Sequence, residues 1–68
     1  MFKNIIIELH DGTKLINDPY IGFNHMTMEG LKQCLELSGT YCVYKDKHNY
    51  DFLLDREIAG IYYEEDKL

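Results

Sequence analysis

The chain has 68 residues and a net charge of −5, from 12 acidic and 7 basic side chains. A chain of this length forms one small domain, residues 1–68, and buries only about 60% of the surface that its unfolded form exposes. The negative charge disfavours binding to nucleic acid and to anionic membranes, because their phosphate groups would repel it.

Two strands joined by a tight turn are predicted at the start of the chain. Residues 2–9 alternate in the manner of a strand, with Ile5, Ile7 and Leu9 on one face. The dipeptide Asp11-Gly12 then separates this segment from a second β-prone run over residues 13–17, which is typical of a hairpin.

The segment 18–25 is the main predicted loop, opened by Asp18-Pro19. Its side chains Tyr20, Ile21 and Phe23 are too apolar for a loop that only meets solvent. We expect them to plug the end of the core. The alternative is an exposed patch that binds a partner.

A short helix is predicted over residues 28–37, with Thr27 as its N-cap and Gly39 as its stop signal. The spacing of its apolar residues defines one stripe that faces the core. The members of this stripe are Met28, Leu31, Cys34 and Leu35.

Three strands are predicted in the remainder, over residues 40–46, 50–54 and 58–64. The last two are separated by the charged corner Asp55-Arg56-Glu57, which suits a turn or a single 3₁₀ turn. Because the final strand carries apolar side chains on both faces, we expect it to be central or covered on both sides.

The strand, charged corner and strand that end the chain, from Tyr50 to Glu65, resemble in shape the end of SH3-like and Sm-like small barrels. This resemblance covers about a quarter of the chain and implies a fold without a function. The predicted class is α+β, in the order β-β-α-β-β-β, with one short helix on a small, strongly bent antiparallel sheet. An open sheet with the helix on one face is the alternative.

No catalytic, cofactor or metal motif is present in the sequence. The candidate metal ligands show none of the spacings of zinc sites, and no phosphate-binding or nucleophile motif occurs, so we expect neither an enzyme nor a bound cofactor. With no signal peptide at the start, we expect a cytoplasmic protein in which Cys34 and Cys42 are free and buried.

Six tyrosines are more than so small a core is expected to bury, and tyrosine suits contact surfaces. The sequence therefore favours a small acidic interaction module that binds a protein with a basic surface. An inhibitor or regulator of the type encoded by phages and mobile elements fits this description. The alternative is a structural homo-oligomer of small-barrel type. An Sm-like RNA-binding ring is disfavoured by the acidity.

The residues expected to contact the partner are acidic and aromatic side chains of the loop and of the C-terminal stretch. They are Tyr20, Phe23, Asp51, Asp55, Glu57, Tyr62, Tyr63, Glu64 and Glu65. Since Tyr62 and Tyr63 are adjacent on a strand, we expect one to face the partner and the other to face the core.

Overall fold

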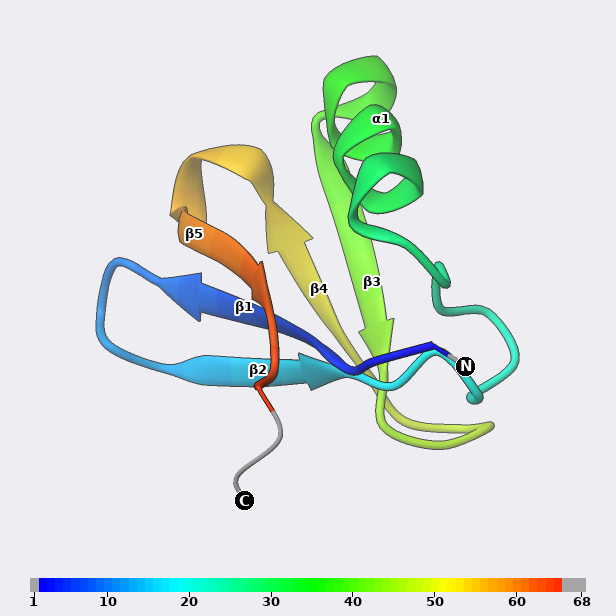
Figure 1. The fold of residues 1–68 in the computed structure, drawn as a ribbon. Coiled ribbons are helices and arrows are strands. Elements are labelled where there is room, and N and C mark those ends of the chain that lie inside the picture. The colour runs from blue at the N-terminus through cyan, green and yellow to red at the C-terminus, as the bar shows by residue number, and fades with distance from the viewer. Residues whose placement is uncertain (1, 66–68) are drawn as a thin grey trace.

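The computed structural model describes residues 2–65, which form one α-helix, five strands and one 3₁₀ turn. Their order is β1 (Ile5–Leu9), β2 (Lys14–Asn17), α1 (Met28–Ser38), β3 (Thr40–Tyr44), β4 (Tyr50–Leu54), η1 (Asp55–Glu57) and β5 (Ile58–Tyr63). The strands form two antiparallel sheets, one in the order β2-β1-β5 and one of β3 and β4 (Figure 1).

This arrangement confirms the predicted α+β class and the predicted order of elements. The strands divide between two separate sheets, so neither the closed small barrel nor the strong bend of a single sheet is confirmed. In the part of the chain that the structure describes, no helix is long and apolar enough to span a bilayer.

The β1–β2 hairpin follows from the Asp11-Gly12 turn. Gly12 adopts a left-handed conformation with φ of 92°, which a residue with a side chain rarely takes. The Asp11 carboxylate accepts a hydrogen bond from the Thr13 N–H at 2.8 Å, and bonds from Thr13 hold the pKa of Asp11 below its usual value. The sequence signal therefore corresponds to a defined turn geometry.

Helix α1 begins and ends at the predicted caps. The Thr27 side chain accepts a hydrogen bond from the Gly30 N–H at 3.2 Å. Gly39 is left-handed, with φ of 73°, and its N–H donates to the Leu35 carbonyl at 2.7 Å. In Figure 1, α1 stands next to β3, which follows it directly in the chain.

The core lies between the two sheets and the helix. Its buried members are Ile5, Ile7, Leu31, Leu35, Tyr41, Val43 and Leu53. Cys34 and Met28 pack against this cluster while remaining partly exposed, which confirms the predicted helix stripe. The sheets and the helix therefore share a single core.

The prediction that β5 is central or covered on both faces is wrong. Among the described residues, β5 pairs only with β1 and lies at the edge of its sheet. Its side chains are half-buried or exposed throughout. Each face of β5 is therefore shielded from solvent only in part. Several ends also differ: β1 starts at Ile5, β2 at Lys14, and β3 stops at Tyr44.

The prediction that Tyr20, Ile21 and Phe23 plug the core is wrong for the two aromatic rings, while Ile21 is half-buried. Tyr20 and Phe23 are 68% and 74% exposed. The loop is attached instead by the buried polar side chain of Asn24, whose amide donates to the Tyr44 carbonyl and whose Oδ1 accepts from the Tyr44 N–H. These bonds, at 2.9 and 2.8 Å, occupy the backbone of β3 as a neighbouring strand would.

A second buried polar contact connects the other end of the loop to the sheets. Asn17 is fully buried and accepts a 2.6 Å hydrogen bond from the Tyr41 hydroxyl. That hydroxyl accepts in turn from the His25 N–H at 3.0 Å, and burial raises the pKa of Tyr41. Hydrogen bonds therefore hold this loop where apolar packing was expected.

Candidate functional site

An apolar hollow lies on the outer face of the three-stranded sheet. The strand register places Ile16, Ile6 and Tyr62 in one row across β2, β1 and β5, pointing away from the core. This row forms the floor of a hollow of about 730 Å³, which we call the outer groove. Its lining residues are Ile6, Lys14, Ile16, Tyr62, Tyr63, Glu64 and Glu65.

Carboxylates border the outer groove where β5 ends. Glu64 and Glu65 are both exposed, and Glu64 accepts a hydrogen bond from the Asn4 side-chain amide at 3.1 Å. Lys14 also lines the groove, and its register partner on β1 is the acidic Glu8. The groove therefore combines an apolar floor with a local excess of negative charge.

Tyr62 and Tyr63 point to opposite faces of β5, as alternation predicts: Tyr62 stands opposite Ile6 on the outer face, and Tyr63 stands opposite the core residue Ile5. Neither ring is buried, however. They are 39% and 36% exposed, and both line the outer groove. The Tyr63 hydroxyl accepts a hydrogen bond from the Met28 N–H at the start of α1, at 3.1 Å. The edge position of β5 leaves room for both rings, since no further strand covers Tyr63 within residues 2–65.

The structure does not gather the predicted acidic residues on one face. Asp55 and Glu57 lie in η1, separated from Glu64 and Glu65 by the whole of β5, or roughly 20 Å of strand. Glu57 has a local structural role, because its Oε1 accepts a hydrogen bond from the Leu54 N–H at 2.9 Å.

Asp51 lies apart from both groups, on β4. Its Oδ2 is 3.3 Å from Lys45 Nζ, and it accepts no hydrogen bond within the described part of the chain. The contact is thus an ion pair without hydrogen-bond geometry. Of the nine residues predicted to bind a partner, the outer groove unites Tyr62, Tyr63, Glu64 and Glu65.

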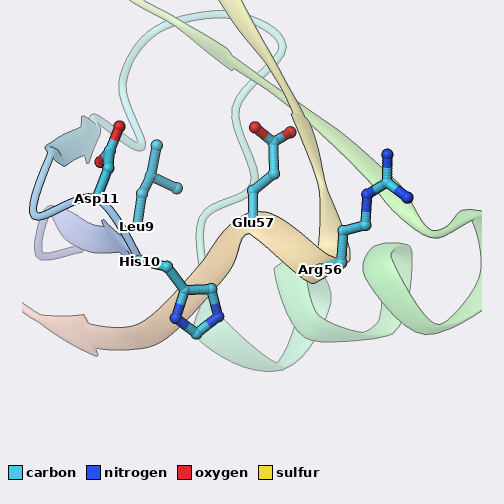
Figure 2. A pocket seen from close by; sticks show the side chains of 5 residues that line it. All are labelled: Leu9, His10, Asp11, Arg56 and Glu57. Atoms are coloured by element: carbon cyan, nitrogen blue, oxygen red, sulfur yellow. The ribbon is translucent and has the colours of Figure 1, made fainter.

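A smaller hollow of about 350 Å³ lies between the β1–β2 turn and η1, where His10 N–H donates to the Glu57 carbonyl. Figure 2 shows that its polar side chains diverge: the His10 ring and the Arg56 guanidinium extend away from each other on opposite sides of Glu57. The three groups therefore do not converge on a point where a substrate atom would lie.

A second apolar surface lies on the outward side of the two-stranded sheet. Tyr44 and Tyr50 are register partners with ring centroids 5.1 Å apart, and the Phe23 ring lies 5.2 Å from Tyr44. Phe52 follows on β4 and is 58% exposed. We call these four residues the aromatic face. Tyr20 lies elsewhere, with its hydroxyl bonded to the Phe2 N–H.

Sequence reasoning missed the floor of the groove and most of the aromatic face. Ile6 and Ile16 were assigned to strands, but their direct pairing across β1 and β2 depends on the register set by the turn. Alternation over residues 50–54 predicts that Tyr50 and Phe52 share one side of a strand. It could not show that Leu53, on the other side, is the residue that enters the core.

The two cysteines are free thiols and are half-buried, less shielded than expected. Among residues 2–65, no three His, Cys, Asp or Glu side chains are grouped so that they would hold a metal ion. Comparison with protein-family models, with curated proteins and with solved structures finds no significant match.

Proposed function

We propose that the chain is a protein-interaction module whose outer groove binds a segment of a partner protein carrying apolar residues next to Lys or Arg. The observation that supports this is the meeting, in one hollow, of the Ile6–Ile16–Tyr62 floor with the carboxylates of Glu64 and Glu65. Action as a cytoplasmic inhibitor or regulator, without catalysis, belongs to the same proposal.

The two parts of the groove have different energetic roles. Ile6 is already buried, but contact with the exposed parts of Ile16 and Tyr62 removes apolar surface from water, at about 25 cal/mol per Å², and so provides most of the affinity. The rim carboxylates are exposed, and an exposed ion pair contributes about 1 kcal/mol or less. They act mainly on the association rate and on the choice of a basic over an acidic partner.

A designed peptide tests this proposal. The probe is a blocked peptide of about eight residues that alternates Val and Lys, compared with one that alternates Val and Glu. Binding is followed by NMR at the Ile16 amide, which reports on the groove. Wild-type protein should bind the Val/Lys peptide more tightly than the Val/Glu peptide. The double variant Glu64→Lys/Glu65→Lys should lose on the order of tenfold in affinity for Val/Lys.

The double variant Glu29→Lys/Glu36→Lys is the matched control. It changes the net charge by the same amount, but at exposed positions of α1. It should bind nearly as wild type does. Added salt should abolish the effect of reversal at Glu64 and Glu65. Equal losses in the two double variants would show that only net charge matters, against the proposal.

The apolar part of the groove is tested with Ile16→Ser at high salt, where charge effects are screened. Ile16 is 50% exposed, so its replacement should weaken binding without unfolding the protein. Undiminished binding by Ile16→Ser would exclude the groove floor as the contact surface.

Light scattering of the free protein tests the alternative function. The measured mass distinguishes a monomer from a structural homo-oligomer.

A further inference from the structure

One edge of β4 has backbone groups that point away from its sheet. Both backbone groups of Tyr44 bond to the Asn24 side chain, so they face away from β4. In an antiparallel pair, residues directly opposite share this orientation, so the N–H and C=O of Tyr50 also point outward. The pattern repeats at every second residue, which places the N–H and C=O of Phe52 on the same open edge.

Leu54 supports this assignment. Its N–H bonds to the Glu57 side chain at 2.9 Å, outside the β3–β4 ladder, as expected two residues beyond Phe52. Within residues 2–65, no strand pairs with this edge of β4. Because an exposed strand edge is a template for pairing with another chain, these groups are available to a partner backbone.

The outward side chains of Tyr50 and Phe52 belong to this edge strand, and Tyr44 and Phe23 continue the aromatic face across β3. Phe23, Tyr50 and Phe52 are 74%, 53% and 58% exposed. At about 200 Å² for an aromatic side chain, they present roughly 400 Å² of largely apolar surface. A patch of this size, with no charged member, is typical of an interaction site.

The size and charge of the surface decide which occupant fits. A standard interface between globular proteins buries about 800 Å² on each partner, so this face alone is too small for a second copy of the chain. A second copy would also bring a net charge of −5 toward an equal charge. A single extended segment needs less area, because backbone hydrogen bonds supply part of its affinity.

We propose that β4 accepts an extended, uncharged segment of a partner protein as a third strand of the β3–β4 sheet. Backbone bonds to Tyr50 and Phe52 hold the segment, and its alternate apolar side chains pack beside the Tyr50 and Phe52 rings of the aromatic face. β-branched residues suit these positions because they pack well beside aromatic rings across strands. This surface shares no residue with the outer groove and does not rest on the function proposed for it.

The test uses a chain made by chemical synthesis with a methyl group on the backbone nitrogen of Phe52. The methyl group removes the outward donor and leaves the aromatic ring in place. The probe is a blocked peptide of about eight residues that alternates Val and Thr. Wild-type protein should bind it with downfield shifts of the Tyr50 and Phe52 amide protons. N-methylation of Phe52 should weaken binding at least tenfold with an unchanged thermal melt.

N-methylation of Asp51 is the matched control, because it tests which N–H groups of β4 point toward β3 and which point outward. By the same alternation, its N–H lies in the ladder to β3, so this chain should melt at a lower temperature. The proposal is overturned if N-methylated Phe52 binds the peptide as wild type does, or if that chain is the one that loses stability. It is also overturned if the β4 amides shift with protein concentration alone, because a second copy would then occupy the edge.

Discussion

At the scale of single residues, the loop between β2 and α1 depends on two buried asparagines. Asn24 bonds to both backbone groups of Tyr44 and to the Asp18 carbonyl, and Asn17 bonds to the Tyr41 hydroxyl and the His25 carbonyl. Composition identifies asparagine as a turn residue but not as a buried connector. The sequence therefore predicted the position of the loop but not the hydrogen bonds that attach it to the sheets.

Replacement of Asn24 by Ala should destabilise the protein by about 2 kcal/mol, because it leaves the N–H and C=O of Tyr44 without their partners in a shielded position. The measurement is the free energy of unfolding from urea denaturation. Asn4→Ala is the control, since Asn4 makes one exposed hydrogen bond to Glu64, and its loss should change stability by less than about 0.5 kcal/mol. Equal effects would refute the structural role given to Asn24.

At the scale of elements, sequence signals that act within a few residues predicted turns and helix ends correctly, whereas the pairing of distant strands was not predicted. The Asp11-Gly12 turn, the Thr27 cap and the Gly39 stop all act within a few residues, and the structure has each of them. The edge position of β5 depends instead on which strands meet across the chain. Its two apolar faces suggested a central strand because alternation does not report hydrogen-bonded neighbours.

Helix α1 offers a direct test of the shared core. Leu35 is 5% exposed and Leu37 is 81% exposed on the same helix. Leu35→Asp places an unpaired charge in the core and should unfold the domain, at a cost of several kcal/mol. Leu37→Asp should leave the circular dichroism melt nearly unchanged. Superimposable melts for the two variants would contradict the packing of α1 against the sheets.

At the scale of the whole molecule, the chain places its apolar residues in one core and on two outer surfaces. The core takes one face of each sheet and the helix stripe. The outer groove and the aromatic face lie on the other faces of the two sheets. Of the candidate site, the sequence predicted the tyrosines and carboxylates at the end of β5. The apolar floor beside them could not be predicted, because it requires the register of three strands.

The acidic charge is likewise distributed rather than concentrated. Asp51, Glu57 and Glu64 each contact different neighbours, and among the acidic residues in 2–65 only Glu64 and Glu65 border the outer groove. Net charge therefore predicted the kind of partner without locating the contact. Repulsion between acidic copies at low salt follows from the total of −5, while the recognition that we propose depends on the two groove carboxylates.

The measurement that tests the outer groove most directly is a titration of isotope-labelled protein with the Val/Lys peptide, followed by NMR at every backbone amide. The predicted result is a saturable shift of the amides that line the groove, at Ile6, Lys14, Ile16 and residues 62–65, with α1 unaffected. Groove amides that stay unmoved at saturating peptide would contradict the assignment, whatever other part of the surface responds.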